Sequence, residues 1–417
     1  MFRSLRNYNY RLFAAGGVVS NVGTWMQRTA QDWLVLDLAH GRGSALGVTV
    51  ALQFLPTMLF GMFGGVIADR YPKRRTLMVA QTLMGLLALT MGVLVLTGTA
   101  RVWHVYVMAF TLGLVSCVEV PTRQSFVVEM VGRRDLPNAI ALNSSTFNLA
   151  RVVGPAVAGL LISWMGTGPI FVLNAVSFAA VISGLVLMRA SELRSPEPVP
   201  RGKGQLREGL RYVGGRPDLL LPLLLVAFMA IFAQSFSTSI ALMAKQAFGA
   251  GASSFGVASS AFAVGAFGGA LLAARRLKPS RRFLITGALC FGLFQIAAGL
   301  APVYATFLLM LVPAGMAMIT VNTTANTMVQ LGASPEMRGR VMGIYVLVFT
   351  GGAPIGSPLV GWLAELAGPR VSVVAAGILS LCGVGLAVLV TRMVAARVAL
   401  RKESAREQIV RGTAAAA

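Results

Sequence analysis

The sequence is poor in charged residues, and above all in acidic ones. Only 12% of its 417 residues are charged, and 14 Asp and Glu stand against 36 Lys and Arg. A soluble chain would carry about a quarter charged residues, so this composition excludes an ordinary soluble protein. The 56% of hydrophobic residues and the mean hydropathy of +0.74 indicate a membrane protein that crosses the bilayer several times.

Several chemical signatures are also scarce or missing from the sequence. The three cysteines lie within apolar runs, which predicts small core residues and neither a disulfide framework nor a metal site. The two histidines, His40 and His104, are too few for a histidine-based metal path. The sequence has no G-x-x-x-x-G-K-S/T loop, so ATP is not the direct energy source. We therefore expect no enzyme and no cofactor.

Twelve apolar stretches are long enough to span a bilayer as helices. The segment that precedes the first one is too polar for a signal peptide, so we expect this helix to be retained. The expected spans are 12–38, 46–68, 76–98, 102–130, 139–165 and 168–188, followed by 218–243, 255–274, 283–301, 303–331, 339–366 and 370–395.

Basic residues gather in alternate loops between these spans. Most of the 36 Lys and Arg fall on the side that holds both termini, which the positive-inside rule places in the cytoplasm. The formal charge of +22 is therefore interpreted as a topology signal and a contact with anionic lipid headgroups, and nucleic-acid binding is not expected. We expect a monomer.

A repeat divides the chain into two halves. Helix 46–68 contains GMFGG and helix 255–274 contains GAFGG, each followed by a basic loop. Such glycines permit close approach of neighbouring helices. The predicted fold is an all-α membrane protein with two pseudo-symmetric six-helix bundles. Its predicted domains are an N-terminal bundle (1–188), a cytoplasmic linker with an amphipathic surface helix (189–217), a C-terminal bundle (218–396) and a basic tail (397–417).

The loop GGVIADRYPKRR (64–75) resembles the signature between the second and third helices of the major facilitator superfamily, with Pro72 in place of the usual glycine. The resemblance implies a latch that closes the cytoplasmic side, formed by Gly65, Asp69, Arg70, Arg74 and Glu129.

Within this latch, the resemblance implies that Asp69 lies at the N-terminus of helix 339–366, where the helix dipole favours a carboxylate. It also implies that Arg70 or Arg74 pairs with Glu129. The alternative is that these basic residues only anchor the loop at the membrane surface, but that role would require neither of the two acids.

Other stretches, among them GTWMQRTAQDWLVLDL and SPEMRGRVMGIY, resemble the branch of this superfamily that contains the enterobactin exporter and related bacterial efflux proteins. RVVGPAVAG partly resembles the antiporter motif of the fifth helix, with Ala150 and Ala158 where glycines are usual. The resemblance implies proton-driven export of a small molecule, such as a drug, an antibiotic or a siderophore-like metabolite, across the bacterial inner membrane.

Polar residues recur at helical spacing inside the apolar spans. On a period of 3.6 residues, Asn21, Trp25, Arg28 and Asp32 share one face of helix 12–38. A charge that faces lipid costs at least a few kcal/mol, so we expect these side chains to face a cavity. The predicted substrate cavity comprises Asn21, Trp25, Arg28, Gln31, Phe147, Arg151, Gln234, Asn322 and Asn326, with further apolar lining from Phe54, Phe232, Phe236 and Phe262.

Two acids are candidates for carrying the coupled proton, Asp32 and Glu119. Desolvation favours the neutral form of a carboxylate and a neighbouring arginine favours the charged form, so separating the two can switch protonation. Arg123 resembles the fourth-helix arginine implicated in proton coupling across the superfamily, and we expect it to modulate the carrier.

A structural alternative is that Arg28 with Asp32, and Glu119 with Arg123, only neutralise each other and hold helices together. Arg151 is then the excess positive charge: either it shares Glu119, or it is available for an anionic group on the cargo. Two other functions stay open, an importer or uniporter of the same fold and a non-transporting membrane sensor or assembly protein.

Overall fold

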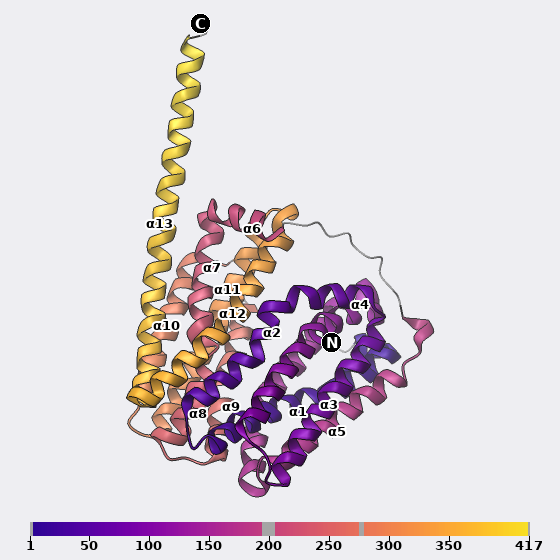
Figure 1. Ribbon diagram of the computed structural model, residues 1–417. Coiled ribbons are helices and arrows are strands. Elements are labelled where there is room, and N and C mark those ends of the chain that lie inside the picture. The colour runs from indigo at the N-terminus through magenta and orange to yellow at the C-terminus, as the bar shows by residue number, and fades with distance from the viewer. Residues whose placement is uncertain (1–2, 194–204, 275–278, 416–417) are drawn as a thin grey trace.

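The computed structural model describes residues 3–193, 205–274 and 279–415, which are almost entirely helical (Figure 1). The first set of helices precedes the linker helix α6 (Gln205–Gly214), and the second set follows it. The first set comprises α1 (Tyr8–Leu38), α2 (Gly43–Arg70), α3 (Lys73–Leu96), α4 (Val102–Met165) and α5 (Gly168–Val186). The second set comprises α7 (Pro217–Ala233), α8 (Phe236–Leu242), α9 (Ala252–Ala274), α10 (Arg281–Gly299), α11 (Tyr304–Gly332), α12 (Pro335–Ala367) and α13 (Pro369–Ala415).

Within the described residues, eleven helical segments are long and apolar enough to cross a membrane. Two of them, Val102–Gly132 and Arg134–Met165, belong to α4, which kinks at Gly132. Gly132 has a φ of 68°, a non-helical conformation that glycine adopts without steric cost, so two helices meet there at a sharp kink. α7, α8 and the π-helical turn Met243–Ala247 together form one segment. α1 is not among the eleven, and it carries the polar stripe of Asn21, Arg28 and Asp32.

Helix pairing recurs in the two sets. α2 packs along α4 in the first set, and α9 packs along α11 in the second. Glycines create both contacts, because a Cβ on Gly113 would overlap the carbonyl oxygen of Gln53, and one on Gly315 would overlap that of Phe262. The two repeated motifs lie in the same helix pairs. A Cβ on Gly64 would overlap the Cys117 carbonyl, and a Cβ on Gly265 would overlap the Val312 carbonyl. The close approach expected from these glycines is present in both sets.

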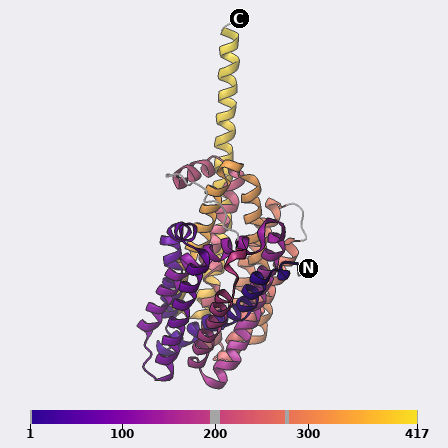
Figure 2. The same cartoon turned by 90° about the vertical axis from the view of Figure 1, so that its right-hand side faces the viewer.

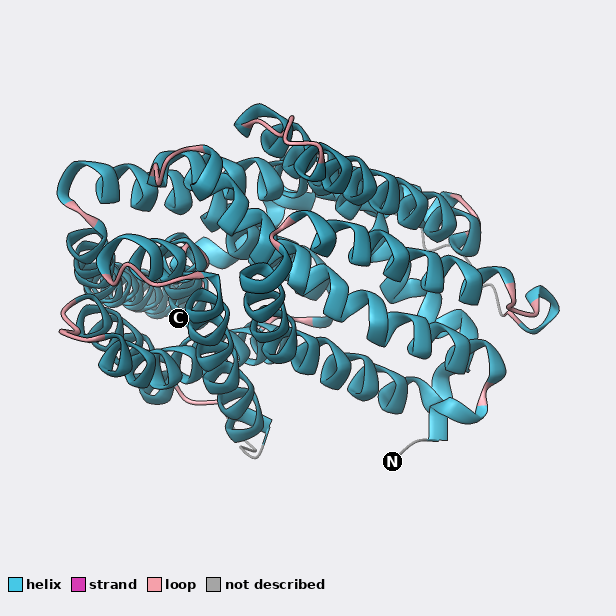
Figure 3. Ribbon diagram, turned by 90° about the horizontal axis from the view of Figure 1, so that it is seen from below, coloured by secondary structure: helices cyan, strands magenta, loops and turns pink. Residues whose placement is uncertain are grey.

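The two sets contact each other at the end of the molecule opposite α6 (Figures 1 and 3). There the backbone of α2 at Gly43 touches that of α12 at Gly361, and a Cβ on Gly256 of α9 would overlap the Pro155 carbonyl of α4. Toward the α6 end, no atom lies near the Cβ positions of Gly339 and Gly343 on α12. The close contacts between the sets are thus concentrated at one end.

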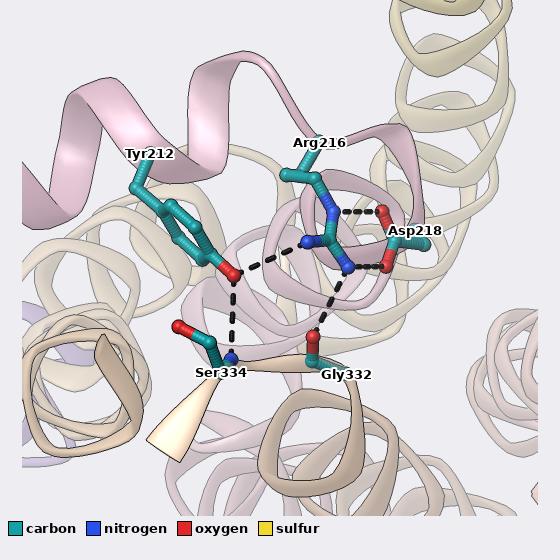
Figure 4. Close-up of polar contacts among 5 residues, drawn as sticks. All are labelled: Tyr212, Arg216, Asp218, Gly332 and Ser334. Atoms are coloured by element: carbon teal, nitrogen blue, oxygen red, sulfur yellow. Dashed lines mark hydrogen bonds and ion pairs between the residues drawn. The ribbon is translucent and has the colours of Figure 1, made fainter. Parts of the chain in front are cut away.

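α6 is fastened to the second set (Figure 4). The Arg216 guanidinium donates to both carboxylate oxygens of Asp218, at 2.9 and 2.6 Å, and to the Gly332 carbonyl at 3.1 Å. The Tyr212 hydroxyl accepts a hydrogen bond from the backbone N–H of Ser334 at 3.3 Å. These bonds join the end of α6 to α7 and to the turn between α11 and α12.

Two further predicted segments are the amphipathic helix of the linker, which corresponds to α6, and the basic tail. Val213 of α6 is buried, whereas Leu210 is exposed and the side chain of Leu206 lies outside the described residues. α6 also pairs Glu208 with Arg340 of α12 at 2.6 Å. The region predicted as a separate tail, 397–417, continues α13 as a helix to Ala415, which projects beyond the other helices (Figure 2).

Candidate functional site

A cavity with a volume of about 150 Å³ lies between the two sets of helices. Its first-set wall comes from α1, α2 and α4, and its second-set wall comes from α7, α8, α9 and α11. The residues that line it are Trp25, Arg28, Thr29, Asp32, Val50, Gln53, Phe54, Arg151, Pro155, Ala233, Gln234, Ser237, Ile240, Phe255, Ser259, Phe262, Ala263 and Met318.

The charged wall of this cavity is built around Trp25. The guanidinium carbon of Arg28 lies 5.0 Å from the centroid of the Trp25 ring, and that of Arg151 lies 5.8 Å from it. Gly154 explains why Arg151 reaches this ring: it lies about one turn further along α4, and a Cβ there would come within 2.5 Å of the Trp25 Cβ. The missing side chain lets α4 approach α1.

Neither arginine has a partner of opposite charge at contact distance. Among the described residues, no carboxylate lies within 4.0 Å of Arg28 or Arg151, although Asp32 lines the same cavity one turn from Arg28. Each cation–π contact is worth about 0.5–2 kcal/mol, whereas removing an ion from water costs several kcal/mol. The Trp25 ring therefore offsets only part of the cost of two partly buried guanidinium groups. The expected ion pair between Arg28 and Asp32 is not formed in this conformation.

The opposite wall carries no charged side chain among the residues that the structure describes. Gln234 lies at the junction of α7 and α8, and Ser237 and Ser259 add two hydroxyl groups. The remaining lining of this wall is apolar, with Phe255 and Phe262 as its aromatic members. Of the four expected phenylalanines, Phe54 and Phe262 line the cavity. Phe236 is fully buried behind Phe262 at a centroid distance of 5.2 Å, and Phe232 is not part of the lining.

Glu119 and Arg123 form a separate cluster inside the first set. The Arg123 Nε donates to Glu119 at 2.6 Å, and the amide of Gln81 donates to the same carboxylate at 3.1 Å. Arg123 also reaches the side-chain oxygen of Asn21 at 3.4 Å. Glu119 is only 4% exposed, and neither it nor Arg123 lines the cavity between the sets. The two candidate proton carriers therefore lie in different places, and Glu119 is bonded to Arg123 and not to Arg151.

Four other predicted cavity residues, Gln31, Phe147, Asn322 and Asn326, are not part of the cavity lining. Gln31 is buried, and its amide reaches Gln53, which does line the cavity, at 3.4 Å. Phe147 packs edge-on against Trp25 with ring centroids 5.7 Å apart. The two asparagines belong to α11 of the second set. Asn322 lines a smaller hollow with Gln234 and accepts a hydrogen bond from Tyr345. Asn326 instead accepts a hydrogen bond from Gln330 on the same helix at 2.6 Å.

Sequence reasoning missed Gln53, Ser237 and Ser259 as cavity residues. Gln53 had a usable signal, because it is a lone amide in an apolar span and such groups need a polar partner or water. The two serines had none, since serines are common in membrane helices and often bond to their own backbone.

The predicted latch residues are arranged differently from the expectation. Glu129 pairs with Lys73, at 2.6 Å, and not with Arg70 or Arg74. Arg74 donates instead to the carbonyl oxygens of Leu185 and Val186, at 2.6 and 2.8 Å, at the C-terminal end of α5 where a positive charge is favoured. Gly65 is half-buried on α2, and the nearby Asp69 and Arg70 are exposed at its end.

The end of the cavity opposite α6 is closed by contacts that cross between the sets. Asp37 of α1 forms an ion pair with Lys245, and the Ser44 hydroxyl donates to Glu365 of α12 at 2.7 Å. We call Asp37, Lys245, Ser44 and Glu365 the outer clasp. Lys245 also lies 4.9 Å above the ring of Trp33, which closes this end below the clasp.

Comparison with known proteins points to transporters. A family profile described as transmembrane secretion effector matches residues 1–413. A staphyloferrin A transporter of Staphylococcus aureus is 23% identical over 365 residues, which cover 86% of this chain and 90% of that protein. The multidrug efflux pump Tap of Mycobacterium tuberculosis is 24% identical, with 89% and 90% covered. An enterobactin exporter of Shigella flexneri is 25% identical, with 80% and 79% covered. The branch expected from the sequence is confirmed.

The fold is similar to that of solved transporters. The crystal structure of a bacterial homologue of the human lysosomal transporter Spinster, in an inward-facing and occupied conformation, superposes with a TM-score of 0.70. It is 16% identical and covers 94% of this chain and 97% of its own. This likeness concerns the fold alone.

Proposed function

Because the chain belongs to the transmembrane secretion effector family of the major facilitator superfamily, we propose that it is a proton-coupled exporter. Its cargo would be a small molecule, such as a drug, an antibiotic or a siderophore-like metabolite, carried across the bacterial inner membrane by alternating access. The observation that supports this most is the cavity between the two sets of helices, lined from both sides and closed at one end by the outer clasp.

In this proposal α1 is a twelfth span, and each set forms a six-helix bundle that rocks against the other. The repeated close approach of α2 to α4 and of α9 to α11 supports two equivalent halves. The charged stripe of α1 is compatible with a spanning helix because it faces the other helices and the cavity, not lipid. The bundles would be 1–188 and 218–396, with the linker 189–217 between them.

The basic loops and both termini would lie in the cytoplasm. The close contacts between the sets lie at the opposite end, so this conformation corresponds to one closed toward the outside. The latch of Gly65, Asp69, Arg70, Arg74 and Glu129 would close the cytoplasmic end in the alternate state. Lys73, which holds Glu129 here, would then exchange this partner for another.

The driving force would be the proton gradient. A proton that moves down roughly 150 mV releases about 3.5 kcal/mol, which can sustain a substrate gradient of a few hundred-fold. Asp32 or Glu119 would carry the proton, and Arg123 would modulate it. Asp32 faces the cavity, and Glu119 is held by Arg123 and Gln81 inside the first set.

Transport by inverted membrane vesicles tests the proposal. Vesicles that contain the protein should accumulate a fluorescent dye or drug when a proton gradient is imposed, and lose this activity when a protonophore collapses the gradient. Asp32→Asn and Glu119→Gln should separate the two carriers, with the wild type as reference. Full proton-dependent uptake by both variants would contradict the proposed carriers, and gradient-driven movement in the opposite direction would favour an importer.

A further inference from the structure

We propose that the cavity selects organic anions: a carboxylate or similar group of the cargo binds between Arg28 and Arg151, and the rest of the molecule lies against the opposite wall. This inference rests on the proposed transport function, because it names the cargo class of the same cavity. It concerns binding, however, and can be tested without any measurement of flux.

The charge balance of the cavity is the first argument. Among the described residues that line it, the charged members are Arg28, Arg151 and Asp32. Glu119, the other buried acid nearby, is bonded to Arg123 and Gln81 and cannot serve Arg151. One positive charge therefore lacks a counter-charge, and a negatively charged group that enters the cavity supplies it.

The hydrogen bonds of the two guanidinium groups are the second argument. Among the described residues, neither Arg28 nor Arg151 donates a hydrogen bond, although each has five N–H donors. Both are held in place by the ring of Trp25, which fixes their positions without using these donors. A planar guanidinium matches a carboxylate in geometry and binds it through two parallel bonds. The two arginines are thus positioned for an anion, with no described side chain or carbonyl occupying their N–H donors.

The opposite wall defines the rest of the cargo. It offers one amide and two hydroxyl groups, from Gln234, Ser237 and Ser259, among aromatic and aliphatic side chains such as Phe255 and Phe262. A wall of this kind binds an apolar or aromatic body that carries a few hydrogen-bonding groups. The cargo class is therefore an amphipathic organic anion, and organic cations should be disfavoured because they would face two arginines.

This charge balance also decides between the two proton carriers. Among the described residues that line the cavity, Asp32 carries the only negative charge, so its protonation strengthens the attraction for an anion. By linkage, a bound anion then favours protonation of Asp32 to the same extent. Exchange of a proton for an anion requires the reverse: the bound proton must weaken binding of the anion, and the bound anion must weaken binding of the proton. The exchanged proton must therefore lie on Glu119, outside the cavity, and Asp32 tunes the affinity for cargo.

A matched pair of probes tests the proposal: dansyl-phenylalanine, which has a carboxylate, and dansyl-phenylalaninamide, which is neutral at this position. Binding to the purified full-length protein is measured in detergent by energy transfer from tryptophan to the dansyl group. We expect the carboxylate probe to bind at least about tenfold more tightly than the amide, because paired charges in a desolvated site discriminate strongly. Equal affinity, or no binding of either probe at millimolar concentration, would overturn the proposal.

Three variants localise this preference. Arg151→Gln should weaken binding of the carboxylate probe to the level of the amide and leave binding of the amide unchanged, whereas Arg151→Lys should retain part of the preference. Asp32→Asn should bind the carboxylate probe more tightly than the wild type at pH 8, with a weaker dependence on pH. Equal weakening of both probes by Arg151→Gln would indicate a structural role and contradict the inference. A carboxylate preference in binding without any flux in proteoliposomes would refute the transport proposal and leave the anion site standing.

Discussion

The two sets of helices share their packing and differ in their charges. In both, glycines bring the second and fourth spanning segments into backbone contact, at Gly113 in the first set and at Gly315 in the second. Among the described residues, however, the two buried acids, Glu119 and Glu129, both belong to the first set. The buried polar side chains of the second set are uncharged, such as Ser235, Thr238, Gln295 and Thr324.

This difference teaches that the packing of the helices does not dictate where the charges lie. The same close approach of helices accommodates an ion pair in one set and only neutral groups in the other. In the part of the chain that the structure describes, the first set therefore holds the buried acids and the charged side chains of the cavity, and the second set supplies an uncharged wall. Four experiments test whether the two sets share their packing and differ in their charges, and the expected effects decrease from the first to the last.

The largest effect is expected from Glu119→Gln. This change removes the negative charge that pairs with Arg123, whose side chain is 24% exposed, so the cost should stay below the about 3–5 kcal/mol of breaking a fully buried pair. Thermal unfolding in detergent should still shift strongly downward. The matched neutral change in the second set, Gln295→Met, should cost no more than about 1.5 kcal/mol, because it removes a single uncharged hydrogen-bonding group. Similar losses in both variants would contradict the division.

Glycine substitutions test whether the packing is shared. Gly64→Ala and Gly265→Ala should each destabilise the protein by about 1–3 kcal/mol, because the new methyl group would overlap a backbone carbonyl of the neighbouring helix. Gly268→Ala is the control, since no atom lies near its Cβ position in the same motif. It should be neutral or slightly stabilising in the same unfolding assay. A loss for Gly268→Ala as large as for Gly265→Ala would rule out this explanation.

The outer clasp should have a smaller effect, on conformation and not on folding. Asp37 is half exposed, so its ion pair with Lys245 is worth about 0.2–1 kcal/mol. Asp37→Asn should shift the population by up to about fivefold toward the conformation open to the outside. The distance between spin labels at Val66 of α2 and Val346 of α12 reports this shift. An unchanged distance distribution would mean that the clasp does not hold this state.

The smallest effect is expected at α6. Tyr212→Phe removes the acceptor for the Ser334 N–H and the contact with Arg216, both in a partly exposed site. The expected loss of stability is about 0.5 kcal/mol, the low end for a hydrogen bond because the site is partly exposed, with transport unaffected because these residues lie outside the cavity. Faster hydrogen exchange confined to α6 and the turn between α11 and α12 would support this assignment, and a change spread over the first set would oppose it.

The sequence by itself determined the membrane class, the approximate position of the spans and the face on which Trp25, Arg28 and Asp32 lie. Each of these depends on local physics: the length of an apolar run, the cost of a charge in lipid and the period of the helix. The family could likewise be recognised from local motifs, which the match over residues 1–413 confirms.

Only the tertiary structure decided which charged groups meet. Glu129 pairs with Lys73 instead of Arg70 or Arg74, and Glu119 is enclosed with Arg123, apart from the cavity that holds Arg151. Helical period gives the direction of a side chain, but the choice of partner depends on the distance and rotation between helices. Those are set by contacts far apart in the sequence, such as Gly154 against Trp25, which local patterns do not reveal.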